Sequence, residues 1–200
     1  MKTQMKFQKI MCLLMVILGA LSAVYCFIYC SAGLGAIGAT IQANGNPNAD
    51  MPEAVIYQDV QPFNNLLLIL SIVIILCGVL LYITATNKRR NYYISNYVAI
   101  GIVSIADIVI SVYILIQNSV FFGRFLDIIA DPTYYERLSK ILAEADVVCT
   151  ASTWNFALGY VLYPIIIIAS LALIFNLVWK IMLMRGEKAL LENNAVKEVA

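Results

Sequence analysis

Four long apolar blocks constrain this chain more than any other feature of its sequence. They cover residues 10–32, 66–85, 94–117 and 156–179, and only one of them contains a charged side chain. About 20 apolar residues in a helix, rising 1.5 Å each, cross the roughly 30 Å hydrocarbon core of a bilayer. The alternating apolar and polar strands of a membrane barrel are absent. We therefore predict an all-α integral membrane protein, a four-transmembrane-helix bundle that forms one domain over residues 1–200.

The composition agrees with a protein embedded in lipid. Hydrophobic residues make up 62% of the chain and charged residues 12%, and the mean hydropathy is +0.85. A soluble domain is about a quarter charged, so this chain would have too little polar surface to face water. We expect the lipid bilayer as its first partner and do not expect it to bind nucleic acid.

The positions of the basic residues predict the orientation. Of the 13 lysines and arginines, ten precede the first block, lie in the segment 86–93, or follow the fourth block. Basic residues near the ends of spans stay on the cytoplasmic side. We therefore expect a plasma (cytoplasmic) membrane protein with both termini inside, an inner loop at 86–93 and a cytoplasmic tail at 180–200. The segments 33–65 and 118–155 are expected to be outer loops.

The second outer loop contains a predicted helix. Asp131 and Pro132 form a typical helix start, with an acidic N-cap followed by proline at the first helical position. One face of the following turns is apolar, formed by Leu138, Ile141, Leu142 and Ala145. The pattern predicts a short amphipathic helix over residues 132–146. Its expected role is to cap the bundle or rest on lipid headgroups, and binding a partner is the alternative.

The charged residue inside the third block, Asp107, is the strongest functional lead. An ionised carboxylate at mid-bilayer costs about 2.5 to 3.5 kcal/mol on insertion scales, so such residues normally face a bundle interior. Gly101, Ser104, Asp107 and Ser111 fall on one helical face. We predict that this intramembrane polar stripe packs against other helices or water rather than lipid.

The sequence also limits what Asp107 can contact. None of the four blocks contains a lysine or arginine, and the chain has no histidine. The neutral partners expected at similar depth are Ser22, Ser71 and Ser170, and in such surroundings we expect the carboxyl to be protonated. Three roles remain open. Asp107 could help the chain's own helices pack, contact a partner subunit or another copy of the chain, or bind a proton or cation in transport.

The cysteines form a second candidate site. Cys26 and Cys30 lie four residues apart on one face at the end of the first block, and Cys149 precedes the fourth block. All three are expected on the outer side, where disulfides persist. We predict a possible disulfide between Cys149 and either Cys30 or Cys26. Cys12 and Cys77 are expected to be buried apolar residues.

The sequence contains no motif for enzymatic chemistry. Motifs for phosphoryl transfer, acyl transfer and metal hydrolysis are absent. The lack of histidine removes haem, most zinc sites and the commonest general base. We expect no enzyme, no cofactor and no metal site. The favoured function is an accessory or assembly subunit of a membrane complex. The alternative is a small oligomeric transporter or channel that uses Asp107 as its proton or cation site.

Overall fold

The structure, a computed structural model, describes residues 2–31, 52–86, 94–133, 136 and 153–199. Side chains are described for a subset of these residues, namely 6–27, 56, 59–83, 85, 97–133, 136 and 153–186.

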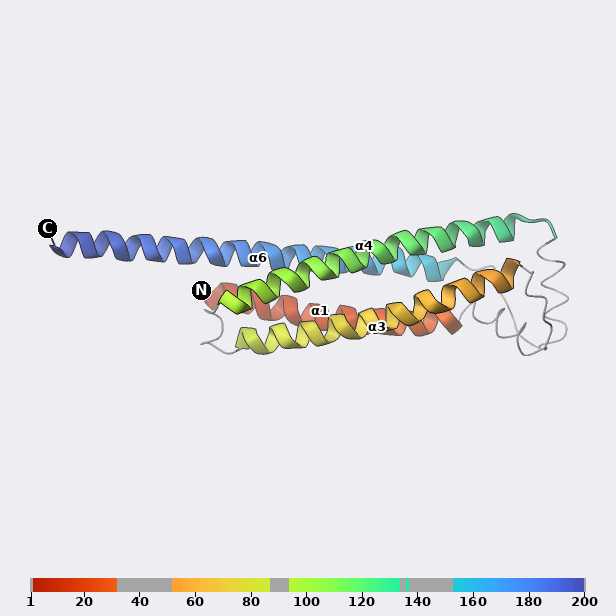
Figure 1. The fold of residues 1–200 in the computed structure, drawn as a ribbon, viewed down its shortest axis with the longest axis horizontal. Helices are drawn as coiled ribbons and strands as arrows, with labels where there is room; N and C mark the ends of the chain where they lie inside the picture. The colour runs from red at the N-terminus through yellow and green to blue at the C-terminus, as the bar shows by residue number, and fades with distance from the viewer. Residues whose placement is uncertain (1, 32–51, 87–93, 134–135, 137–152, 200) are drawn as a thin grey trace.

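The described residues form four long α-helices. They are α1 (Lys2–Ser31), α3 (Pro52–Thr86), α4 (Ile94–Ala130) and α6 (Trp154–Val199). Each contains a stretch long and apolar enough to cross a membrane: Lys6–Phe27, Asp59–Ile83, Tyr97–Ala130 and Trp154–Gly186. The prediction of an all-helical chain with four potential membrane spans is confirmed. Figure 1 shows one elongated bundle in which consecutive helices run in opposite directions.

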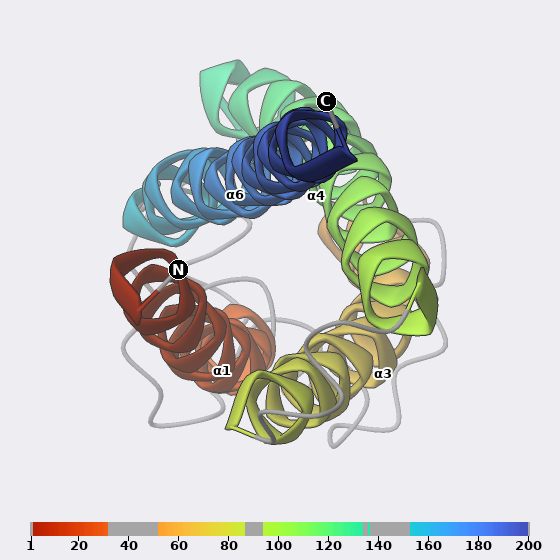
Figure 2. The ribbon, with the colours of Figure 1, turned by 90° about the vertical axis from the view of Figure 1, so that its left-hand side faces the viewer.

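The four helices form a ring in the order α1, α3, α4, α6 (Figure 2). On α4 the buried side chains alternate at spacings of four and three: Ile100, Ser104, Asp107, Ser111, Ile114, Asn118, Phe121 and Phe125. This is the heptad spacing of left-handed helix bundles, in which every third or fourth residue faces the neighbouring helices. The other three helices bury residues at similar spacings, and so the interior is a narrow axial seam.

Two glycines allow close contact between α1 and α3. A Cβ atom on Gly19 would lie 2.8 Å from Ile75 Cγ1 and 3.2 Å from the Ile75 backbone nitrogen. A Cβ atom on Gly78 would lie 2.9 Å from Val16 Cγ2 and 3.3 Å from the Val16 nitrogen. Both distances to backbone are tighter than ordinary van der Waals contact. Small residues at such positions let membrane helices approach closely.

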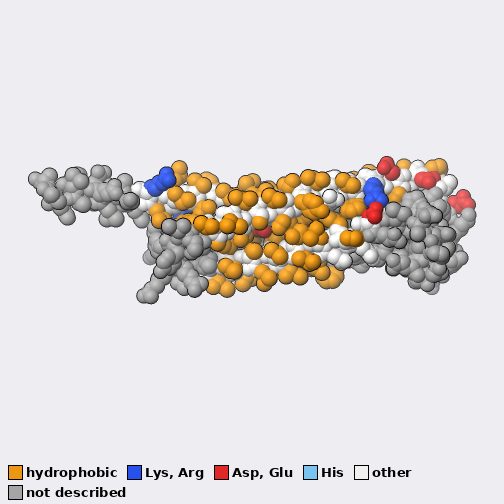
Figure 3. All heavy atoms as spheres, viewed as in Figure 1, with side chains coloured by type: hydrophobic (Ala, Val, Ile, Leu, Met, Phe, Trp, Pro, Cys, Tyr) orange, Lys and Arg blue, Asp and Glu red, His pale blue; other side chains and the backbone are white. Residues whose placement is uncertain are grey.

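The outer surface of the bundle is suited to lipid. Large apolar side chains are exposed along all four helices, including Phe27, Leu76, Ile102 and Ile168, which are each more than half exposed. Figure 3 shows apolar atoms over most of the middle of the bundle, with charged atoms toward its two ends and an acidic side chain visible between the apolar atoms of the middle. At one end, Arg124 Nη2 on α4 lies 2.8 Å from Asp59 Oδ2 on α3. We call this end of the bundle the far end. The opposite end, where α1 and α4 begin, is called the N-terminal end.

The helices extend beyond the apolar blocks. α3 begins at Pro52 rather than near Leu66, and it continues through Pro62, although these prolines favour extended or turning backbone in the sequence. α4 continues past Gln117 to Ala130. The reason is packing: Ile56, Val60 and Phe63 on α3 are buried. On α4, Phe121 and Phe125 are buried in the same way, so the interior spacing continues outside the most apolar sequence.

The predicted amphipathic helix lies almost entirely outside the described residues. At Asp131, where the N-cap of this helix is predicted, the Thr133 backbone N–H and hydroxyl both donate to Asp131 Oδ1, at 2.9 and 2.8 Å. A carboxylate that accepts such bonds terminates one helix and can cap another. The helix over 132–146 stays a prediction.

Candidate functional site: a polar line inside the bundle

Polar side chains are buried along the whole length of the bundle. We call the following set the polar line: Gln8, Ser22, Asn64, Ser71, Ser104, Asp107, Ser111, Asn118, Asn155, Ser170, Asn176 and Lys180, each at most 7% exposed. They come from all four helices and occupy the interior positions of the seam. Buried polar groups normally have hydrogen-bond partners, because an unpartnered group costs about 1 to 3 kcal/mol.

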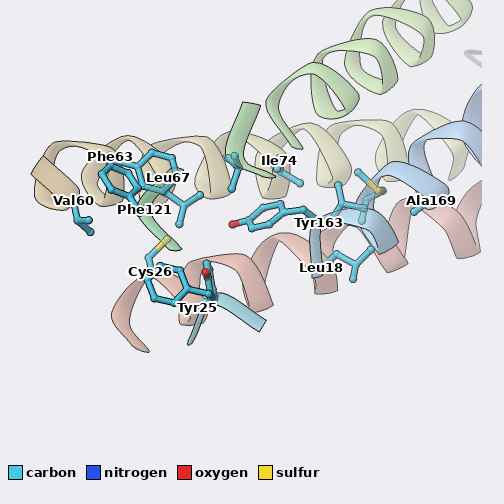
Figure 4. Close-up of a cluster of buried hydrophobic side chains, with 14 of the residues drawn as sticks. Leu18, Tyr25, Cys26, Val60, Phe63, Leu67, Ile74, Phe121, Tyr163 and Ala169 are labelled. Atoms are coloured by element: carbon cyan, nitrogen blue, oxygen red, sulfur yellow. The ribbon is translucent and has the colours of Figure 1, made fainter. Parts of the chain in front are cut away.

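The middle of the polar line is a hydroxyl network. Ser22 Oγ on α1 lies 2.7 Å from Ser71 Oγ on α3 and 2.9 Å from the Tyr163 hydroxyl on α6. Ser71 Oγ also donates to the Leu67 carbonyl oxygen at 2.8 Å. Figure 4 shows Tyr163 reaching from α6 into the space between α1 and α3. Three helices are therefore joined at one depth.

Toward the far end, an amide continues the line. The Tyr25 hydroxyl donates to Asn118 Oδ1 at 3.4 Å, and Asn118 Nδ2 donates to the Phe156 carbonyl oxygen at 3.1 Å. Gly159 makes room for this contact, because a Cβ atom there would lie 2.7 Å from the Tyr25 oxygen. Asn118 lies on the same helical face as the predicted stripe and continues its heptad spacing.

From the hydroxyl network toward the N-terminal end, the polar line includes side chains that have no hydrogen-bond partner. Within the described part of the chain, Ser104 Oγ, Asp107 Oδ2 and Ser111 Oγ are buried and have no hydrogen-bond partner. The structure thus places three of the four stripe residues in the interior. Gly101 is half-buried, and a Cβ atom there would meet Leu177 Cδ2 at an ordinary 3.7 Å. Glycine is therefore not required at this position for helix contact.

Contacts between α4 and α6 define the depth of Asp107. The Tyr160 hydroxyl donates to Ser119 Oγ at 2.8 Å, and the Tyr97 hydroxyl donates to Met184 Sδ at 2.7 Å. Interpolation along these antiparallel helices places Asp107 level with residues 172–174. Asp107 is thus in the middle part of the bundle, about three helical turns from the hydroxyl network.

The expected serine partners bind elsewhere. Ser22 and Ser71 bind each other and Tyr163, and Ser170 Oγ lies 3.9 Å from Met15 Sδ. Ser170 lies within about one helical turn of the depth of Asp107. The sequence did not predict Tyr163 as the partner of Ser22, because nothing in it indicates which way the side chain of a tyrosine in a membrane span points.

Lys180, which is expected at the start of the cytoplasmic tail, is buried to 3% exposure. It follows Asn176 by four residues, so both lie on the interior face of α6. Its ammonium lies 4.5 Å from the centre of the Tyr97 ring. Lys180 is about 10 Å along the axis from the depth of Asp107, which is too far for an ion pair.

The cysteine site is described only in part. Cys26 is buried, and its thiol donates to the Ser22 carbonyl oxygen at 3.2 Å. The side chain of Cys30 and all of Cys149 lie outside the described residues. The disulfide of Cys149 with either Cys30 or Cys26 therefore stays a prediction.

The helices also leave an apolar cavity of about 340 Å³ between α1 and α6. Its walls are Leu18, Leu21, Val24, Tyr25, Leu158, Val161, Leu162 and Ile165. These side chains suit a lipid chain and provide almost no polar contact, so the cavity adds nothing to the chemistry of the polar line. Among the described residues, no group of three or more side chains suited to a metal ion comes together.

Comparison with family models, curated proteins and solved structures found no match to this chain.

Proposed function

We propose that this protein is a non-enzymatic multi-pass membrane carrier or channel, and that Asp107 is the site that binds and releases a proton. The observation that supports this proposal best is the row of buried, unpartnered polar atoms around Asp107 in the centre of the bundle.

These atoms are difficult to explain by packing alone. A protonated carboxyl that only joined helices would donate to one of the nearby serines, yet Ser104 and Ser111 on the same helix face also lack partners among the described residues. Three unpartnered groups at about 1 to 3 kcal/mol each are costly. Water or an ion in the interior would satisfy them, as it does in other polar cavities.

The hydroxyl network favours a proton over a metal cation. In the contacts of Ser22 with Ser71 and with Tyr163, either oxygen can be the donor. A chain of hydroxyls can reverse its hydrogen-bond direction when a proton passes, with Ser71 turning its single hydroxyl hydrogen from the Leu67 carbonyl oxygen to Ser22. A hard metal cation instead requires several oxygen ligands around one point. We therefore propose a proton as the transported species, with a small monovalent cation as the alternative.

We propose the plasma membrane as the site of action, with the N-terminal end of the bundle in the cytoplasm. The support is the excess of basic residues in the chain segments at that end. Each copy of the chain encloses one narrow row of polar side chains and so provides one path. We propose a homo-oligomer, with one path in each copy, as the working form.

An accessory or assembly subunit is the second candidate function. The observation in its favour is that α6 extends well beyond the other three helices at the N-terminal end (Figure 1). A projecting helix of this kind is suited to contact a partner. Asp107, however, faces the chain's own interior at 3% exposure, so a partner subunit would not reach it in a closed bundle.

Proton flux into liposomes tests the proposal. Purified protein would be reconstituted around a pH-sensitive dye, and a potassium diffusion potential would drive protons inward. We expect wild-type protein to acidify the lumen faster than empty liposomes, and Asp107→Asn to abolish the difference. Asp127→Asn is the matched control, because Asp127 is an exposed carboxylate on the same helix.

The proposal fails if Asp107→Asn conducts as well as wild type, or if wild-type liposomes behave like empty ones. A sodium or potassium gradient in the same liposomes distinguishes a proton from a small cation. If a partner is recovered from native membranes with the full chain but not with a chain that ends at Gly186, the assembly function gains support instead.

A further inference from the structure

A second group of buried, unpartnered side chains lies at the N-terminal end of the bundle, away from Asp107. It consists of Gln8 on α1 with Asn176 and Lys180 on α6, at 0%, 0% and 3% exposure. In the part of the chain that the structure describes, both amide atoms of Gln8, both of Asn176 and the Lys180 ammonium have no hydrogen-bond partner.

The contacts between α1 and α6 bring these residues to one level. Ser22 on α1 pairs with Tyr163 on α6. Seven residues closer to the N-terminal end of the bundle on each helix, Met15 meets Ser170. Seven more residues, or about two helical turns, place Gln8 level with Leu177, the neighbour of Asn176. Gln8 and Asn176 are both fully buried at this level, so we infer that their amides share one part of the interior. Lys180 lies one turn further along the same face of α6.

The charge of this group is positive. Apart from the face of the Tyr97 ring, the described residues offer Lys180 no compensating group, and the only described ion pair joins Arg124 to Asp59 at the far end. A buried ammonium without a counter-charge is strongly unfavourable. The neighbouring amides can turn their NH₂ groups toward the same point as the ammonium, and all three groups would then donate.

We propose that Gln8, Asn176 and Lys180 form a binding site for a small inorganic anion of the size of chloride. Such an anion accepts hydrogen bonds from every direction and balances the lysine charge. Its size suits side chains that are almost completely buried, whereas a phosphate group requires a larger opening. This site is separate from Asp107 and does not depend on the proposed proton transport.

Direct binding of radioactive chloride to the purified full-length protein tests the site. We expect saturable binding to wild-type protein in a detergent solution with gluconate as the replacement anion. Lys180→Met should weaken binding by about tenfold or more, since a charged donor is lost. Asn176→Leu should also weaken binding, while keeping a side chain of similar size.

Arg185→Met is the matched control, because Arg185 is an exposed cation on the same helix, and it should bind like wild type. Bromide should displace the bound chloride, and inorganic phosphate at the same concentration should not. The site is disproved if wild-type protein shows no saturable binding, if Lys180→Met binds as tightly as wild type, or if phosphate displaces chloride better than bromide does. Circular dichroism identifies any variant that has lost its helices. If Lys180→Met has lost them, Asn176→Leu serves as the test instead.

Discussion

Ser22 Oγ and the Tyr163 hydroxyl lie 2.9 Å apart and join α1 to α6 in the interior of the bundle. The two residues are separated by most of the chain, and Ser22 at the same time contacts Ser71 on α3. One serine thus links three of the four helices. Ser22 and Ser71 belong to the polar line, which leads from the far end toward Asp107. The network that joins the helices therefore also forms part of the proposed proton path.

A double-mutant cycle should measure this link. We expect Ser22→Ala and Tyr163→Phe to show a coupling free energy of about 0.6 to 1.7 kcal/mol, the range for hydrogen bonds between membrane helices. Reversible unfolding in mixed micelles is the measurement. The control cycle is Ser119→Ala with Tyr160→Phe, whose 2.8 Å contact is exposed and should couple more weakly. Equal coupling in both cycles would contradict the interior network.

The contact of α1 with α3 should depend on glycine. Gly78→Ala places a Cβ atom 3.3 Å from the Val16 nitrogen and 3.4 Å from the Cys12 carbonyl oxygen, where backbone cannot easily move. We expect a loss of about 1 to 3 kcal/mol in the free energy of unfolding. Gly123→Ala is the same change on α4 with no described atom within 4 Å, and it should be neutral or slightly stabilising. If Gly78→Ala is as stable as Gly123→Ala, the close packing of α1 on α3 is wrong.

The sequence predicted the four potential membrane spans, but it predicted few of the side-chain contacts between the helices. Blocks of apolar residues identify four spans because crossing a bilayer requires length and hydrophobicity only. The spacing of Ser104, Asp107 and Ser111 similarly indicates one helical face. Which helix that face meets depends on tertiary packing, so Tyr163 could not be assigned to Ser22. Lys180 was expected in the cytoplasmic tail because positive residues next to an apolar block usually mark the membrane boundary. Its burial, like that of Gln8 and Asn176, follows only from the packing of the helices.

The orientation can be tested with single cysteines in a cysteine-free chain. Glu136 and Gly186 are exposed, and they lie toward opposite ends of the bundle. We expect a membrane-impermeant maleimide to label Glu136→Cys in intact cells and to label Gly186→Cys only after the cells are lysed. Labelling in the opposite order would show that the orientation in the membrane is the reverse of the proposed one.

The outer disulfide is tested by alkylation under non-reducing conditions followed by mass spectrometry. The Cys26 thiol donates to the Ser22 carbonyl oxygen, so we expect Cys149 to be linked to Cys30 rather than to Cys26. Cys26→Ala should leave the linked peptide unchanged, and Cys149→Ala should remove it. A linked peptide that contains Cys26 would show that the outer end of α1 differs from the structure.

The central claim is that Asp107 binds and releases the proton that crosses the bundle. A hydrophobic carbodiimide reacts with protonated carboxyl groups in apolar surroundings, so one sample of wild-type protein can provide both the extent of labelling and the proton flux. We predict that the reagent modifies Asp107 but not Asp127, and that flux falls in proportion to the modified fraction of Asp107. Unchanged flux in protein whose Asp107 is fully modified would contradict the claim.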